Sequence, residues 1–196
     1  MGLPERPRSR NGAGLPAVTA EQIVDAAVGL TAESGLGNWT LRQLAARIEA
    51  SPAVVYHHVG DREAVVCLVL ERVVRELAVP PETLPWRKWF ERLLADHRVV
   101  LRKYPGVAYR LAMHGAPVVD LGVRLLQEAG FDSESVLAYN VLLTTACHYI
   151  AMEDTPGGYR ESTGLVAASE KQAELFQYAV QRCLDGLECR LNERKA

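Results

Sequence analysis

The stretch that decides the fold is residues 40–64, which read TLRQLAARIEASPAVVYHHVGDREA. It predicts two short helices joined by a tight turn. Thr40 and Gln43 form a capping box, in which the hydroxyl caps the first turn and the amide reaches back, so a helix begins there. Ser51 and Pro52 open the second helix, because serine caps a first turn and proline suits the first helical position. Two short helices with this spacing are typical of a helix-turn-helix.

Helical signals flank this stretch on both sides. A second capping box at Thr19 predicts a helix that ends at Gly35, since glycine adopts the left-handed cap without steric cost. Asp61 caps a further helix, expected to run from residue 62 to about residue 79. An ordinary three-helix packing unit, with the tyrosine and histidines of its third helix merely exposed, fits the same pattern. The helix-turn-helix is therefore a hypothesis at this point.

Residues 40–64 resemble the DNA-binding domain of the tetracycline-repressor (TetR) family. The resemblance rests on family positions that this chain fills without gaps: Thr40, Leu44-Ala45, Ser51, Tyr56, His58-Val59, Asp61-Arg62 and Ala64. It covers about residues 19–70. The chain departs from the family at Glu49, where the family usually has a glycine in the turn. The resemblance implies an N-terminal three-helix DNA-binding domain.

The resemblance also implies which side chains meet DNA. The candidates are Thr40, Arg42, Ser51, Pro52, Ala53, Val54, Tyr56, His57, His58 and Arg62. A guanidinium such as that of Arg42 suits the two acceptors of guanine in the major groove, and small apolar side chains suit thymine methyl groups. Tyr56 and Arg62 are expected to hold backbone phosphates, which fix the register without reading sequence. For His58, packing beside the edge of the core is an alternative.

Residues 1–17 are expected to form a flexible basic arm. Arg6, Arg8 and Arg10 alternate with proline and serine, and as an arm they could reach a neighbouring groove. A disordered tail without DNA contacts is the alternative.

The rest of the chain predicts a larger helical domain. Helices are expected at about 86–104, 106–115, 117–129, 133–154 and 168–192. The segments from residue 130 to 154 and from 176 to 188 resemble, more weakly, the dimerisation helices of tetracycline-type repressors. Two such helices in each subunit imply a homodimer held by a four-helix bundle. A two-fold pair of recognition helices in turn implies a palindromic operator.

The family also implies a small-molecule effector in the C-terminal domain. A ligand site is mostly apolar with a few convergent polar groups. The candidate lining is Trp89, Phe90, Leu93, His97, Tyr104, Met113, Leu125, Tyr139, Leu143, Thr144, Cys147 and His148. For each of these residues, simple core packing is the alternative interpretation.

Length, charge and hydropathy limit the other possibilities. The chain has 196 residues, with 22 Lys and Arg against 24 Asp and Glu, so its net charge of −2 does not by itself favour nucleic acid. No uninterrupted apolar run approaches the roughly 18 residues of a membrane-spanning helix. The N-terminus has no apolar signal core. We therefore expect a cytoplasmic protein without membrane contact.

Enzyme and metal motifs are missing from the sequence. It contains no GxxxxGK[ST], GxGxxG, GxSxG or HExxH, and its four cysteines form no CxxC pair. His97, His114 and His148 fall on different expected helices. We therefore expect no enzyme activity, no cofactor and no metal site.

These observations predict an all-α, homodimeric transcriptional regulator. Its expected parts are a flexible arm over residues 1–17, a helix-turn-helix domain over 18–65 and a ligand-binding and dimerisation domain over 66–196. We interpret it as a repressor that a small effector releases from operator DNA. The alternatives are an activator, a regulator without a small effector, or a helical small-molecule-binding or scaffold protein that does not regulate DNA.

Overall fold

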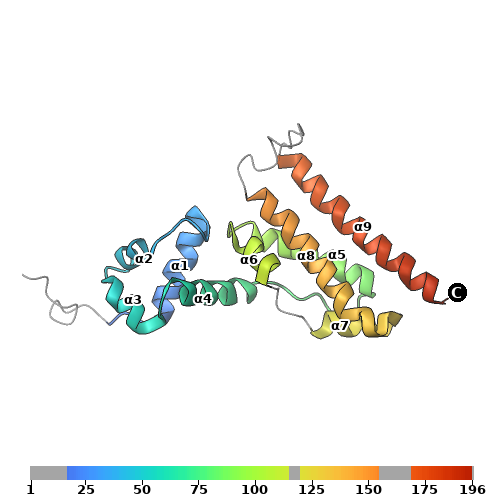
Figure 1. The fold of residues 1–196 in the computed structure, drawn as a ribbon, viewed down its shortest axis with the longest axis horizontal. Helices are drawn as coiled ribbons and strands as arrows, with labels where there is room; N and C mark the ends of the chain where they lie inside the picture. Colours follow the sequence, from blue (N-terminus) through green and yellow to red (C-terminus); the bar gives the residue numbers. More distant parts are fainter. Residues whose placement is uncertain (1–16, 115–119, 155–168, 196) are drawn as a thin grey trace, which may run out of the picture. The chain divides into compact units, whose positions relative to one another are not determined.

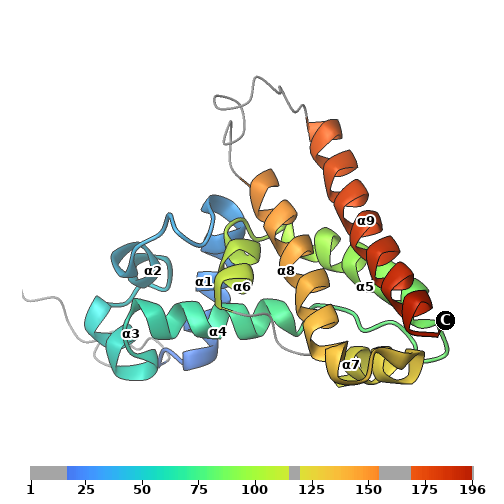
Figure 2. The same cartoon turned by 45° about the vertical axis from the view of Figure 1, so that its right-hand side comes forward.

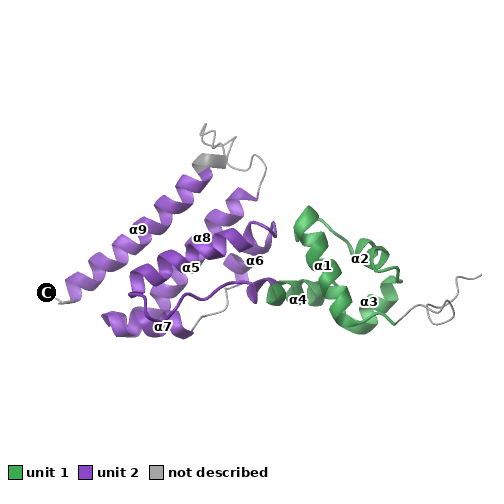
Figure 3. Cartoon of the chain, turned by 180° about the vertical axis from the view of Figure 1, so that it is seen from behind, with its two compact units in different colours: residues 1–72 green, residues 73–196 purple. Residues whose placement is uncertain are grey.

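The computed structural model describes residues 17–114, 120–154 and 169–195. All regular secondary structure in these ranges is helical, which confirms the all-α prediction. The chain divides into two compact units, residues 1–72 and residues 73–196 (Figure 3). The expected arm, except for residue 17, lies outside the described residues.

The first unit contains four helices in its described part. They are α1 (Ala20–Ser34), α2 (Leu41–Arg47), α3 (Pro52–Val59) and α4 (Arg62–Val74), whose last two residues belong to the second unit (Figure 1). Both capping boxes form as predicted, at Thr19 with Gln22 and at Thr40 with Gln43. Gly35 ends α1 with a φ of 89°, a conformation that glycine adopts easily.

The third helix begins where the sequence predicts, but its cap differs from the expectation. Ser51 is the N-cap residue of α3, yet its side chain makes no capping hydrogen bond. Pro52 follows at the first helical position, where its missing N–H leaves no unpaired donor. The backbone N–H of Val54 donates to the Ser51 carbonyl at 3.0 Å. Proline and this turn therefore start α3 without help from the serine hydroxyl.

The fourth helix is capped as expected and ends earlier than expected. Asp61 accepts a hydrogen bond of 2.9 Å from the backbone N–H of Ala64. The helix stops at Val74 rather than near residue 79. Pro80 and Pro81 follow, and the residue before a proline is disfavoured in the helical region. The two compact units divide after Arg72, so most of this helix belongs to the first unit.

The second unit is a helical bundle, and its helices α5, α8 and α9 are longer than any helix of the first unit. Its described elements are α5 (Trp86–Leu101), α6 (Val107–His114), α7 (Asp120–Leu126), α8 (Ser135–Glu153) and α9 (Ser169–Lys195). Helix α8 packs against α9, α6, α7 and α5 (Figure 2). The helices lie close to the ranges that the sequence predicts, with differences of a few residues at their ends.

A corner separates α7 from α8. The chain forms a wide turn over Gln127–Phe131 and a short 3-10 turn over Asp132–Glu134. Gly130 has a φ of 109° and Asp132 a φ of 47°, so neither continues a helix. By length and composition alone, Asp120–Glu153 is apolar enough to cross a membrane. This corner breaks that stretch, and its α8 part packs against other helices of the second unit.

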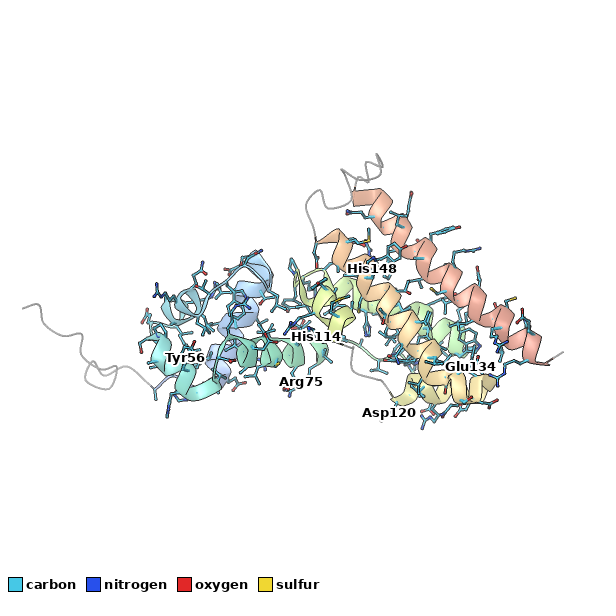
Figure 4. All side chains as sticks on the ribbon, viewed as in Figure 1. Tyr56, Arg75, His114, Asp120, Glu134 and His148 are labelled. Atoms are coloured by element: carbon cyan, nitrogen blue, oxygen red, sulfur yellow. The ribbon has the colours of Figure 1, made fainter. Side chains whose placement is uncertain are left out.

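Two arginines of α9 hold this corner. Arg194 donates to the Phe131 carbonyl at 2.9 Å and to the Asp132 carboxylate at 3.2 Å. Arg190 pairs at 3.0 Å with Glu134, which is labelled in Figure 4. These bonds satisfy carbonyl and carboxylate oxygens at the corner and join the end of α9 to the start of α8.

A cluster of aromatic rings from α5 and α8 lies in the core of the second unit. Trp89, Phe90 and Tyr139 are fully buried, and their rings meet edge to face with centroid distances of 4.9 Å and 5.9 Å. Gly122 of α7 lies against them. A Cβ at this position would be 2.8 Å from the Tyr139 ring and 2.9 Å from the Trp89 ring. The close approach of α7 to α5 and α8 therefore requires glycine.

Candidate functional site

The third helix presents its polar side chains to solvent. Val55 is fully buried, while Tyr56 is 55% exposed and His57 and His58 are exposed. Tyr56 is labelled on α3 in Figure 4. Ser51, Pro52 and Ala53 at the start of the helix are also exposed, and Val54 is half-buried. Most candidate DNA-contacting residues of α3 thus share one accessible surface.

The start of α2 also presents candidate DNA-contacting side chains to solvent. The Thr40 hydroxyl accepts from the Gln43 N–H at 3.2 Å and donates to the Gln43 side-chain oxygen at 2.9 Å. Arg42 is exposed in the first turn of the helix. The other described arginines of the first unit are engaged: Arg47 with Glu33, Arg72 with Asp25, and Arg62 with backbone carbonyls. Within the described part of this unit, Arg42 is the arginine whose guanidinium has no such acceptor.

The ion pair at the end of α2 is a surface feature. Arg47 donates to both carboxylate oxygens of Glu33, at 2.6 Å and 2.7 Å. The hydrogen bond with Arg47 lowers the pKa of Glu33, and the same bond raises the pKa of Arg47. Both side chains are well exposed, so the pair adds little stability. Its effect on the site is to neutralise one positive charge beside α2.

The turn between α2 and α3 is strained at one residue. Glu49 has a φ of 53°, in the left-handed region that side chains with a Cβ rarely adopt. The Ala50 N–H still donates to the Ala45 carbonyl at 2.9 Å, so the turn closes normally. This is the position at which the sequence departs from the glycine of the TetR-family pattern. The turn geometry is kept at a conformational cost of about 1 kcal/mol.

Arg62 is placed differently from the other candidates. Its guanidinium is half-buried and donates to the Leu36 carbonyl at 2.7 Å and to the Trp39 carbonyl at 3.3 Å. It also lies over the Trp39 ring, 4.8 Å from the ring centre. The side chain is therefore directed into its own domain rather than held on the open face of α3. Sequence spacing contained no signal for this contact, because the partners lie more than twenty residues away.

The candidate effector residues divide into a buried and an exposed group. Buried together in the second unit are Trp89, Phe90, Leu93, His97, Leu125, Tyr139, Leu143 and Cys147. Met113, Thr144 and His148 are exposed on α6 and α8, away from that core (His148 is labelled in Figure 4). Tyr104 is half-buried and donates its hydroxyl proton to Glu76 at 2.8 Å.

Two polar groups in the buried set are kept neutral by their surroundings. His97 is 6% exposed, and burial lowers its pKa despite the opposing influence of the Leu93 carbonyl and Asp96. Its Nδ1 atom is buried without a hydrogen bond of good geometry. Burial raises the pKa of the Cys147 thiol to about 12. An apolar core with a neutral imidazole and a thiol suits an uncharged ligand group better than an ionic one.

The sequence did not indicate a charged cluster at the end of α8. Glu153 is nearly buried, accepts hydrogen bonds of 2.9 Å and 3.0 Å from Arg98, and forms an ion pair with Arg102 at 3.0 Å. Beside it, Asp154 accepts a hydrogen bond from the backbone N–H of Gly106. These contacts join α8 to α5 and to the turn before α6. No local sequence pattern signals them, since each partner lies about fifty residues away.

Known proteins share this organisation. Residues 23–66 match the model of the family described as bacterial regulatory proteins, tetR family. An HTH-type transcriptional regulator of Saccharopolyspora erythraea is 35% identical over 94 residues, or 47% of this chain. The match spans only 40% of that regulator's own length.

Solved structures extend the likeness to both units. Mycobacterium smegmatis BioQ has a TM-score of 0.71 at 19% identity, with 87% of this chain and 97% of that chain covered. Streptomyces coelicolor ActR in complex with actinorhodin has a TM-score of 0.63 at 22% identity, with 88% and 99% covered. At these identities the structures show a common fold. The helix-turn-helix segment thus matches the TetR family model, and both units share the fold of these solved structures.

Proposed function

We propose that the chain is a transcriptional regulator that binds a palindromic operator as a homodimer and is released by a small-molecule effector. The exposed polar side chains of α3, together with the unengaged Arg42 of α2, carry this proposal. A short helix with small and polar outer side chains fits the major groove. BioQ, which shares the fold, has been solved with its double-stranded DNA operator.

The roles of individual residues follow from their chemistry. Arg42 reads a guanine, because its guanidinium matches the two acceptors of that base. Pro52, Ala53 and Val54 meet thymine methyl groups. Tyr56 binds a phosphate and sets the register. The Thr40 hydroxyl donates to a second phosphate when it releases the Gln43 side-chain oxygen. His57 and His58 donate to phosphates or to base edges.

Dimerisation is assigned to the outer faces of α8 and α9. Leu137 and Val141 of α8 are 65% and 51% exposed, and Leu175 and Tyr178 of α9 are 40% and 65% exposed. Large apolar side chains at these spacings are typical of helix faces that pack in a four-helix bundle. Two copies related by a two-fold axis would place their recognition helices about 34–36 Å apart on DNA.

An effector is assigned to the apolar core between α5, α7 and α8. ActR, which shares the fold, has been solved with actinorhodin. A ligand there releases DNA only if it binds the DNA-incompetent conformation more tightly than the competent one. The buried His97 is the polar group most suited to orient such a ligand. Repression rather than activation is part of this proposal.

The test is selection of genomic fragments from the source organism by the purified full-length protein. We expect enrichment of one palindromic sequence, whose half-sites are separated by one helical turn. A footprint on the enriched fragment and a reporter gene behind it then distinguish repression from activation. Fragments bound without sequence preference would favour a helical binding or scaffold protein instead. Genes beside the operator would indicate the chemistry of the effector to test.

A further inference from the structure

Arg62 joins the two ends of the helix-turn-helix. It is the first residue of α4 and comes two positions after Gly60, the residue that ends α3. Its two hydrogen bonds reach the Leu36 and Trp39 carbonyls in the loop that leads into α2. One side chain thus spans from the end of the recognition helix to the residue just before the Thr40 cap.

The loop to which Arg62 donates its hydrogen bonds is itself anchored in the core of the first unit. The Trp39 ring lies under the guanidinium, and its indole N–H donates to the Thr31 hydroxyl at 3.0 Å. That hydroxyl donates in turn to the Ala27 carbonyl of α1 at 2.8 Å. Thr31 is fully buried, and Trp39 is 2% exposed. Movement of Arg62 would therefore disturb a continuous polar chain from α4 to α1.

This role needs the shape of a guanidinium and not only its charge. Arginine offers several donors in a rigid plane, so it can bond two carbonyls and stack on an indole at the same time. Lysine carries the same charge on a single ammonium group and cannot reproduce these contacts together. A residue that only neutralised a phosphate would have no such requirement.

We propose that Arg62 is a positioning residue for operator recognition, which acts through the 36–39 loop to hold α2 and α3 at the angle that enters the groove. It does this in place of the phosphate contact that the family pattern implies. The proposal rests on the DNA-binding function proposed above. Its consequence is that loss of the Arg62 contacts harms specific binding, which needs the correct helix angle, more than non-specific binding.

The experiment compares full-length wild type with R62K and R62A. Each protein is titrated with a selected operator fragment and with a non-operator fragment of equal length, at salt concentrations between about 50 and 200 mM. The readouts are the ratio of the two affinities and the salt slope of each. Because both affinities come from one preparation, any unfolded fraction cancels in the ratio. The matched control is R72K, the same change in the same helix at a surface ion pair with Asp25.

We expect R62K and R62A to lower the operator to non-operator ratio at least tenfold, with unchanged salt slopes and unchanged non-operator affinity. R72K keeps the wild-type ratio. If R62K keeps a ratio within fivefold of wild type, the inference is overturned. It is also overturned if R62A flattens both salt slopes by about 0.9, the signature of one lost phosphate contact. A wild type without any operator preference would instead overturn the proposed function on which the inference rests.

Discussion

The carboxylate of Asp154 accepts a hydrogen bond of 2.9 Å from the backbone N–H of Gly106. This bond joins the end of α8 to the turn before α6, where Gly106 has a φ of 87°. Burial raises the pKa of Asp154 to about 6, and the neighbouring charge of Glu153 adds to that rise. The Gly106 N–H and Arg102 act in the opposite direction without cancelling it.

The raised pKa predicts a pH-dependent stability. Because folded Asp154 holds its proton more tightly than unfolded Asp154, this group favours folding as pH falls through about 6 toward the ordinary value of 3.8. Asp154→Asn keeps an acceptor for Gly106 but cannot be charged. We expect the variant to be more stable than wild type by about 1 kcal/mol at pH 7.5, since solvent screens the partly exposed carboxyl.

The difference in free energy of unfolding between Asp154→Asn and wild type should shrink when both are unfolded with urea at pH 5. At that pH wild-type Asp154 is largely protonated. All other titrating groups are common to the two proteins, so they do not contribute to the difference between the two free energies of unfolding. Parallel stability curves from pH 7.5 to pH 5 would contradict the prediction.

A glycine at position 49 should stabilise the first unit. The left-handed φ of 53° strains any residue that has a Cβ. Glu49→Gly relieves this strain, whereas Glu49→Ala removes the same carboxylate and keeps the Cβ. We expect the glycine variant to exceed the alanine variant by about 1 kcal/mol in free energy of unfolding. Equal stabilities of the two variants would show that the turn is not strained at this residue.

An alanine at position 122 should destabilise the second unit. Its Cβ would lie 2.8 Å from Tyr139 and 2.9 Å from Trp89, two rings that are fully buried. Overpacking of this kind costs about 2 kcal/mol, measurable by thermal or urea unfolding. The control is Gly37→Ala in the first unit, where a Cβ meets nothing within 4 Å. If both variants lost equal stability, steric contact at Gly122 would not be the cause.

Charges on the outer faces of α8 and α9 should separate the proposed dimer. Leu137 and Tyr178 are each 65% exposed in the subunit, and a buried glutamate in their place would have no partner. Sedimentation of Leu137→Glu and Tyr178→Glu is expected to give monomers at concentrations where wild type is dimeric. Val99 of α5 is similarly exposed, at 63%, and Val99→Glu serves as the control that stays dimeric. Dimeric Leu137→Glu and Tyr178→Glu proteins would place the interface elsewhere.

Arg42 should set sequence preference. Arg42→Ala removes the proposed bidentate contact with guanine, and we expect about 1–3 kcal/mol less discrimination at one base pair of each half-site. Binding to a set of operators with single substitutions measures this directly. A variant that still rejects every substituted operator as strongly as wild type would show that Arg42 does not read a base.

Local chemistry explains why so much of the helical organisation was predictable. The capping boxes at Thr19 and Thr40 are contacts between residues three apart, so the sequence contains both partners. The same holds for Asp61, which caps a residue three positions later. The kinked end of α7 was not predicted, because it depends on backbone angles at Gly130 and Asp132. Gly122 likewise needed the structure, since its neighbours lie on other helices.

By itself, the sequence determined that this chain is helical, where most of its helices begin, and that residues 40–64 follow the TetR pattern. These properties depend on spacing along one segment, and the structure and family match agree with them. Only the tertiary structure decided what Arg62 and Asp154 contact. Arg62 reaches carbonyls 23 and 26 residues away, and Asp154 reaches an amide 48 residues away. Such contacts arise from packing between distant segments, so no local pattern of residues specifies them.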